Sequence, residues 1–310
     1  MRGMLTLLLV GCGAETGETS WSQVETQGLD ILWVVDNSSS MGEEQDILGS
    51  GFLSFVNELD EDDVRIAVTS TSFDATLGGF EGDTPFITPQ DDDFLSEFAS
   101  RARIGINGGD KEKGLEASIA ALRDNEGDFM RPETLLVVVY VSDEEDCSDG
   151  GLLDGEPPEE CYRQKDSLPP VADYVSELQD VKGTPESVLV GAIVGPKASC
   201  EDSYPGRRYW AAAYQTGGLV GNICEADWSR FMEDLGASST GGLRRRFAVN
   251  ERVVEDTLEV MVGSKVAKGW VWDDEACAIV FDEDTAPEGG AKITATYEID
   301  VDAKPCLAVE

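Results

Sequence analysis

The chain has 310 residues, with 62 Asp and Glu against 23 Lys and Arg, no histidine, and a formal net charge of −39. A surface this negative excludes nucleic-acid binding through phosphate neutralisation and is repelled by anionic lipid headgroups. Without histidine there is no Ser-His-Asp or Cys-His catalytic set and no imidazole metal site. Because 41% of the residues are hydrophobic, we expect a folded acidic protein whose chemistry uses carboxylates, hydroxyls, amides and backbone groups.

The first eleven residues have the pattern of a processing segment. Arg2 precedes an apolar run over residues 4–10, which is too short to span a bilayer. The run ends in Leu-Val-Gly followed by Cys12, and this ending resembles a bacterial lipobox. The resemblance implies that residues 1–11 are a lipoprotein signal peptide and that Cys12 carries the lipid. An ordinary secretory signal and a misassigned start are the alternatives.

The expected location follows from this segment. The protein would be exported and held to the cell envelope by its lipid, with no other membrane contact. Gly13, and not the aspartate associated with inner-membrane retention in some bacteria, follows Cys12, which favours the outer membrane. Residues 12–28 are polar and rich in Gly, Ser and Thr, so we expect them to form a tether.

Residues 29–262 alternate between two kinds of segment. Short apolar runs rich in Val and Ile predict parallel strands that are buried on both faces. These runs cover residues 31–35, 64–70, 135–142 and 188–194. Amphipathic stretches predict helices within 48–59, 115–122, 171–178, 228–235 and 254–261. The alternation predicts a doubly wound, mostly parallel open α/β sheet with helices on both faces.

The pattern changes after Gly263. Residues 270–272 and 278–281 have the composition of short strands, and apolar residues alternate with polar ones over 293–301. We therefore expect a small antiparallel β module over residues 263–310.

Six cysteines remain after Cys12, an even number that indicates disulfides in an exported chain, although six cysteines allow roughly 15 connectivities. Each successive pair lies within one expected loop or module, which favours Cys147–Cys161, Cys200–Cys224 and Cys277–Cys306. A zinc site is the alternative, but the chain has no short CxxC pair and the expected compartment is oxidising.

Oxygen-bearing side chains follow two of the expected strands. Asp36, Ser38 and Ser40 come directly after the run 31–35, and Asp143 follows the run 135–142. Because ligands bind at the carboxyl ends of the strands in open α/β sheets, we expect these side chains to lie close together. Hard oxygen ligands suit one divalent cation, Mg²⁺ first, with Mn²⁺ or Ca²⁺ as alternatives.

The run Asp36-x-Ser38-x-Ser40 after an apolar strand, with Asp143 after a later one, resembles the metal-ion-dependent adhesion site of von Willebrand factor A domains. The resemblance covers residues 29–262, and the whole pattern is similar to secreted bacterial lipoproteins with such a domain. It implies that Ser38 and Ser40 bind the metal directly, and that Asp36 and Asp143 act largely through bound water. It also implies an open coordination position for a protein partner, commonly for an acidic side chain.

The sequence departs from the family at one position. The family contributes a threonine from a Gly-Gly-Thr loop, and here Asp110 is the nearest candidate, with Asn107 or Glu112 as substitutes. Direct binding by Asp110 would neutralise the metal more fully. The hold on an acidic partner would then weaken, and preference would shift toward Ca²⁺.

These observations predict a non-enzymatic binding protein. The alternatives are a carboxylate-based surface hydrolase, such as a glycosidase, and a scaffold with a vestigial metal site. A further alternative for Asp36, Ser38 and Ser40 is that they only cap the first helix of the domain.

Overall fold

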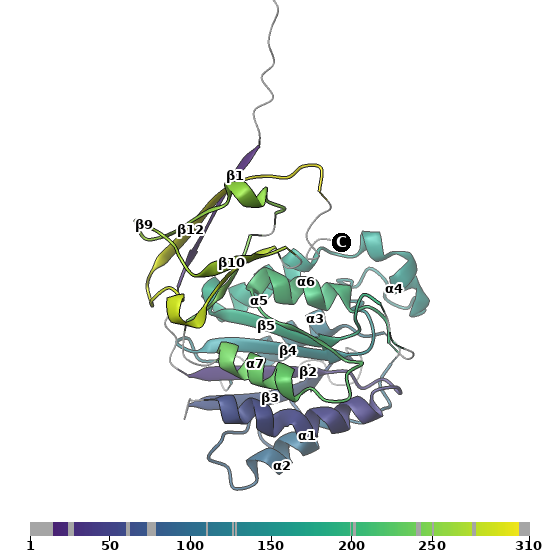
Figure 1. Cartoon of the computed structure of the whole chain (residues 1–310). Helices are drawn as coiled ribbons and strands as arrows, with labels where there is room; N and C mark the ends of the chain where they lie inside the picture. The colour runs from purple at the N-terminus through teal and green to yellow at the C-terminus, as the bar shows by residue number, and fades with distance from the viewer. Residues whose placement is uncertain are drawn as a thin grey trace, which may run out of the picture.

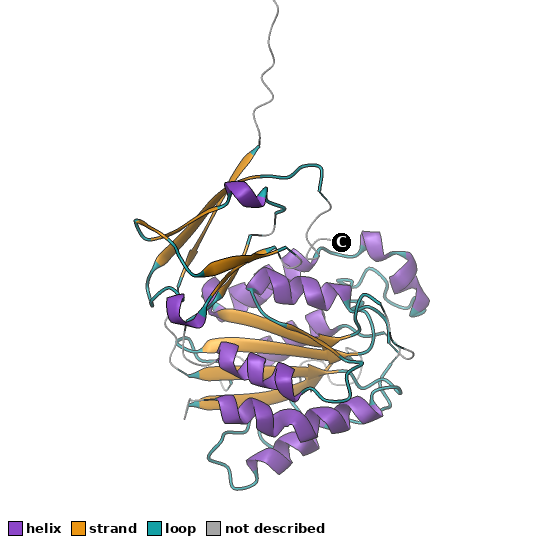
Figure 2. Ribbon diagram, viewed as in Figure 1, coloured by secondary structure: helices purple, strands orange, loops and turns teal. Residues whose placement is uncertain are grey.

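The computed structural model describes residues 15–23, 28–59, 63–72, 79–109, 111–125, 127, 129–198, 200, 203–239, 243–249, 251–274 and 277–303. The described residues form a parallel sheet with helices on both faces and two smaller antiparallel sheets (Figures 1 and 2). Residues 1–11 and Cys12 lie outside them, so the signal peptide and the lipid stay predictions. No helix among the described residues is long and apolar enough to cross a membrane.

The central sheet has five parallel strands in the order β3-β2-β4-β5-β6. The strands are β2 (Leu29–Val35), β3 (Val64–Ser70), β4 (Leu135–Ser142), β5 (Val188–Val194) and β6 (Val220–Asn222). Every residue of β2 and of β5 is buried, as continuous apolar runs require when helices cover both faces. The predicted doubly wound α/β class is confirmed.

Helices pack on each face through apolar side chains. One face carries α1 (Gly42–Glu58), α2 (Phe94–Ala102) and α7 (Ser229–Ser239), and the other carries α3 (Gly114–Asp124), α5 (Val171–Lys182) and α6 (Arg207–Thr216) (Figure 1). Alternate residues of β2 point to opposite faces of the sheet and pack in a separate core on each face. Trp33 packs with Phe52 in one core, and Leu32 packs with Leu115 in the other.

Glycines end two of these helices. Gly183 follows α5 with a φ of 78°, and Gly217 follows α6 with a φ of 74°. This left-handed backbone conformation is the one that glycine adopts without steric cost, so each glycine stops its helix at that point. The remaining helical turns are α4 (Glu159–Arg163) and the 3-10 turns η1 (Lys165–Ser167), η2 (Pro185–Ser187), η3 (Glu255–Thr257) and η4 (Glu283–Thr285).

The antiparallel strands form two sheets with the orders β1-β12-β8-β9 and β10-β11-β7. Their bounds are β1 (Thr16–Ser22), β7 (Arg246–Ala248), β8 (Glu259–Val262), β9 (Lys265–Val266), β10 (Trp270–Asp273), β11 (Ala278–Phe281) and β12 (Lys292–Glu298). Both sheets contribute to one core, in which Phe247, Ile279 and Ile293 are buried.

Three expectations about this region need correction. Thr16–Ser22, placed within a tether over 12–28, pairs with β12 along its whole length, because its alternating side chains match a half-buried sheet. The stretch 254–261 is not a helix but a 3-10 turn followed by β8. Leu258, just before β8, and Val260, within it, are buried with the two-residue period of a strand. The antiparallel part therefore includes β1 and begins again at β7, earlier than residue 263.

Two disulfides join described residues. Cys147 bonds to Cys161 and Cys200 bonds to Cys224, and both predicted pairs are confirmed. The third predicted pair joins Cys277 to Cys306, which lies outside the described residues. Cys147–Cys161 fastens the long loop after β4, and Leu153 and Leu168 pack beside it.

Candidate functional site

Three loops meet at the carboxyl edge of the central sheet. They follow β2, β3 and β4, the neighbouring strands whose pairing brings their ends together. The backbone N–H of Asp36 donates to the carbonyl of Val141 at 2.9 Å, and that of Thr71 donates to the carbonyl of Val35 at 3.1 Å. Side chains that follow these strands therefore share one small region, as the sequence predicts.

Asp36 organises the first of these loops. Its Oδ1 accepts a hydrogen bond of 2.7 Å from the backbone N–H of Ser38, and its Oδ2 accepts one of 2.6 Å from the hydroxyl of Ser142. The side chain is fully buried, and burial raises the pKa of its carboxyl group. Both oxygens are thus used to hold the loop after β2 against the end of β4.

The hydroxyls of Ser38 and Ser40 converge. Their Oγ atoms lie 3.2 Å apart, Ser38 being buried and Ser40 exposed. A metal site needs this convergence. The capping alternative is wrong, because α1 has Met41 at its N-cap and makes no side-chain capping hydrogen bond.

Asp143 follows β4 at the same edge and is buried. Its backbone carbonyl accepts a hydrogen bond of 2.7 Å from the N–H of Tyr204, which ties the loop after β4 to the loop that leads into α6. Asp36, Ser38, Ser40 and Asp143 therefore lie at one edge of the sheet, and their joint binding of a metal stays a prediction. Asp110, the fifth predicted residue, lies outside the described residues.

Glu112 is the site residue that the sequence suggested only as a substitute. Its side chain is buried, its Oε2 accepts a hydrogen bond from the hydroxyl of Thr71, and its Oε1 has no hydrogen-bond partner among the described residues. Burial raises its pKa to about 10, and the negative charge of Asp36 adds to the rise, followed by Glu144 and Asp143. Glu112 therefore belongs to the same carboxylate group as Asp36 and Asp143.

The segment before Glu112 is held over the first loop. The N–H of Gly108 donates to the carbonyl of Asn37 at 2.8 Å, and the hydroxyl of Ser72 donates to Oδ1 of Asn37 at 2.6 Å. A Cβ atom at Gly108 would lie 2.1 Å from Oδ1 of Asn37, so only glycine permits this approach. Asn107, the other suggested substitute, is exposed.

Sequence reasoning missed Thr71 and Ser142. Thr71 directly follows the last residue of β3, and Ser142 is the last residue of β4. A hydroxyl at the carboxyl end of an apolar strand is the signal that could have found them. The structure gives each a definite partner, Glu112 for Thr71 and Asp36 for Ser142. Their hydroxyls orient the carboxylates of Glu112 and Asp36. Thr71 adds the loop after β3 to the loops after β2 and β4.

The arrangement concentrates negative charge beside two hydroxyls. In the described part of the chain, no group of three or more Cys, Asp and Glu side chains is placed to hold a metal by itself. A cation here would need the Ser38 and Ser40 hydroxyls as well as carboxylates. This mixed oxygen set suits Mg²⁺, Mn²⁺ or Ca²⁺, and a divalent cation would offset the repulsion among the buried carboxylates.

Comparisons with known proteins give structural similarities only. No protein-family model matches the sequence, and no curated protein is detectably similar to it. A von Willebrand factor type A protein from Catenulispora acidiphila has a TM-score of 0.47 at 14% identity, covering 94% of this chain and 66% of that one. The pilus adhesin SpaC from Lactobacillus rhamnosus GG, in its open conformation, has a TM-score of 0.43 at 12% identity, covering 94% and 42%. Proximal thread matrix protein 1 from the mussel byssus has a TM-score of 0.43 at 13% identity, covering 74% and 51%.

Proposed function

We propose that the chain is a non-enzymatic binding protein of the cell envelope, of the von Willebrand factor A type, that holds one divalent cation and binds a protein partner through it. The observation that carries the proposal is the 3.2 Å approach of the Ser38 and Ser40 hydroxyls beside the buried Asp36. It lies at the carboxyl edge of the sheet, where open α/β folds bind their ligands.

The proposed roles follow from the hydrogen bonds. Ser38 and Ser40 supply direct oxygen ligands. Asp36 already accepts bonds from the Ser38 N–H and the Ser142 hydroxyl, so its role is to orient the loop and to supply charge, with water completing its link to the metal. Asp143 supplies charge from the end of β4 in the same way.

The negative charge of Glu112 would affect which metal ion the site prefers and how strongly that ion attracts an acidic side chain of a partner. With Asp36 and Asp143 it would place three negative charges around a cation that carries two. The cation would then attract an acidic partner side chain less strongly than one bound mainly by hydroxyls. Mg²⁺ remains the proposed ion, and Ca²⁺, which accepts more carboxylate oxygens, is the principal alternative.

Export and lipid anchoring at Cys12 remain part of the proposal. The disulfides Cys147–Cys161 and Cys200–Cys224 support an oxidising, extracytoplasmic location, because such bonds are rare in reducing compartments. An exposed location also brings the carboxyl edge of the sheet within reach of proteins in the envelope or on neighbouring cells.

Thermal unfolding tests the metal site. We expect Mg²⁺, Mn²⁺ or Ca²⁺ to raise the unfolding temperature relative to chelator, because a ligand at a hundred times its Kd stabilises by about 2.7 kcal/mol. The double variant Ser38→Ala with Ser40→Ala should lose this shift. Ser50→Ala is the matched control, since the Ser50 hydroxyl is exposed and, among the described residues, donates only to the carbonyl of Ile47. An unshifted wild type would favour the vestigial scaffold, and a shift kept in the double variant would place the metal elsewhere.

Binding to a partner needs a second experiment. The immobilised protein should capture a specific protein from envelope extract in Mg²⁺ and release it in chelator. The double serine variant should not capture it. Capture that is equal in Mg²⁺ and in chelator would contradict binding through the cation.

A further inference from the structure

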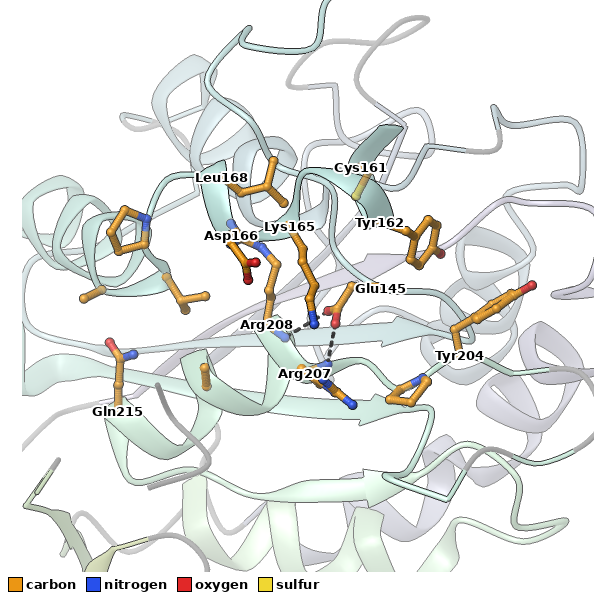
Figure 3. A pocket seen from close by; sticks show the side chains of 15 residues that line it. Glu145, Cys161, Tyr162, Lys165, Asp166, Leu168, Tyr204, Arg207, Arg208 and Gln215 are labelled. Carbon is orange, nitrogen blue, oxygen red and sulfur yellow. Dashed lines mark hydrogen bonds between the residues drawn. The ribbon is translucent and has the colours of Figure 1, made fainter. Parts of the chain in front are cut away.

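A separate cavity lies beside the metal-site region, between α5, α6 and the loop fastened by Cys147–Cys161 (Figure 3). Its volume is about 670 Å³, within the range of about 300–1,000 Å³ usual for small-molecule pockets. Its lining is mainly apolar and includes Leu168, Val171 and Ala211. The disulfide and the packing of Leu168 against it tie this wall to the loop after β4.

The pocket gathers positive charge in an acidic protein. Its lining includes Lys165, Arg207 and Arg208 against Glu145 and Asp166, so its formal charge is +1 while that of the chain is −39. Two of these groups are engaged within the protein. The Arg208 guanidinium pairs with Asp146 at 2.9 Å, and the Glu145 carboxylate accepts bonds from the backbone N–H groups of Arg207 and Arg208 at 3.1 and 2.9 Å.

Lys165 and Arg207 are the cations left for a ligand. Among the described residues, the ammonium group of Lys165 and the guanidinium group of Arg207 make no hydrogen bond and no ion pair. In Figure 3 the Lys165 side chain reaches toward the centre of the drawn residues, and Arg207 lies below it. An arginine fork and a lysine point charge together are suited to one carboxylate.

Two tyrosines give one end of the pocket an aromatic wall. Tyr162 and Tyr204 have ring centroids 5.5 Å apart and are 37% and 58% exposed. Figure 3 shows them on one side of the pocket, with Gln215 on the opposite side. Exposed ring faces beside an apolar floor offer a surface for a flat apolar group.

We propose that this pocket binds a small organic monoanion that has an apolar, aromatic body and one carboxylate. The carboxylate lies between Lys165 and Arg207, and the body packs against Tyr162, Tyr204 and the apolar floor. A single carboxylate matches the two unengaged cations Lys165 and Arg207, and the exposed Asp166 disfavours a second negative charge on the ligand. This binding does not depend on the proposed cation.

Calorimetric titration with phenylacetate and with N-acetyl-L-phenylalanine tests the proposal. Phenylacetamide and N-acetyl-L-phenylalaninamide are the uncharged controls, and acetate is the anion without a body. We expect one saturable site for each acid, and binding of the amides and of acetate weaker by roughly tenfold or more, since a charge-assisted hydrogen bond is lost or the body is missing. The affinity should be the same in Mg²⁺ and in chelator, so failure of the metal site leaves this result unaffected.

Variants locate the site. Arg207→Gln and Lys165→Gln should each weaken binding of the acids several-fold and leave binding of the amides unchanged. Lys292→Gln removes the same charge from an exposed side chain at the start of β12 and is the matched control. Ala172→Trp, which fills the pocket from its exposed rim, should abolish binding of both acids. No saturable binding of either acid at millimolar concentration, equal binding of acid and amide, or unchanged affinity in Arg207→Gln and Lys165→Gln would each overturn the proposal.

Discussion

The hydroxyl of Thr71 donates a hydrogen bond to Oε2 of the buried Glu112, where the end of β3 meets the loop that leads into α3. This bond leaves Oε1 of Glu112 without a hydrogen-bond partner among the described residues, beside Asp36 and Asp143. A buried carboxyl group in this position takes up a proton when no cation is near and gives it up when one binds.

Metal binding should therefore release a proton from Glu112. Because burial raises its pKa to about 10, the group is protonated at neutral pH in the cation-free protein. Calorimetry of metal binding in two buffers of different ionisation enthalpy measures the protons released. Glu112→Gln should release about one proton fewer and bind the cation more weakly, while its cation-free stability changes little. An unchanged proton count in this variant would place Glu112 outside the metal site.

Glu145 should make stability fall as pH rises. Burial raises its pKa to about 7, so the folded protein holds this proton more tightly than the unfolded chain does. The contribution of this proton to the free energy of unfolding is complete below about pH 4.5 and is lost as pH rises to about 7. At about 1.36 kcal/mol per pKa unit, the loss amounts to about 3 kcal/mol. In chelator, Glu145→Gln should show a smaller fall in unfolding temperature between about pH 4.5 and pH 8 than the wild type. Equal falls would refute the assignment.

Gly108→Ala should disturb the site without unfolding the domain. The new Cβ would lie 2.1 Å from Oδ1 of Asn37, so the loop before Glu112 must move outward. We expect a loss of about 1–3 kcal/mol in stability together with weaker metal-dependent stabilisation. Gly127→Ala is the control, because no described residue lies within 4 Å of a Cβ there. Metal-dependent stabilisation equal to that of the control would show that this loop does not support the site.

Removal of the Cys147–Cys161 disulfide should cost about 3 kcal/mol of stability. The two cysteines are 14 residues apart, and a crosslink of about this loop length restricts the unfolded chain by that amount. Urea unfolding of Cys147→Ala with Cys161→Ala measures the loss. The same variant should bind phenylacetate less tightly, because the wall that carries Tyr162 and Leu168 loses its fastening. A loss of stability with unchanged phenylacetate affinity would show that the pocket wall does not need the disulfide to bind phenylacetate.

The sequence predicts the central strands well because each is a continuous apolar run that must be buried on both faces. It misses β6, whose three residues Val220–Asn222 are only half-buried and form no such run. It assigns residues 254–261 to a helix because Val254, Leu258 and Met261 also fit a helical period. Pairing with β12, a contact far away in the chain, decides in favour of a strand.

The sequence likewise predicts the position of some residues of the candidate site and not of others. Asp36, Ser38, Ser40 and Asp143 follow apolar runs directly, so their position at the sheet edge follows from the parallel topology. Glu112 lies at the end of a long loop, and its position depends on contacts of that loop with Thr71 and Asn37. Such contacts between loops leave no periodic signal in a single sequence.

The pairing of β1 with β12 also determines when each part of the protein can fold. Thr19 and Tyr297 are 278 positions apart, yet their hydroxyls lie 2.8 Å from each other. During synthesis the central strands, which end at Asn222, have all their neighbours before β12 exists, whereas β1 must wait for nearly the whole chain. The antiparallel sheet that contains β1 and β12 is therefore expected to assemble last. A chain that stops before β12 would leave β1 and β8 as open edges, ready to pair with other molecules.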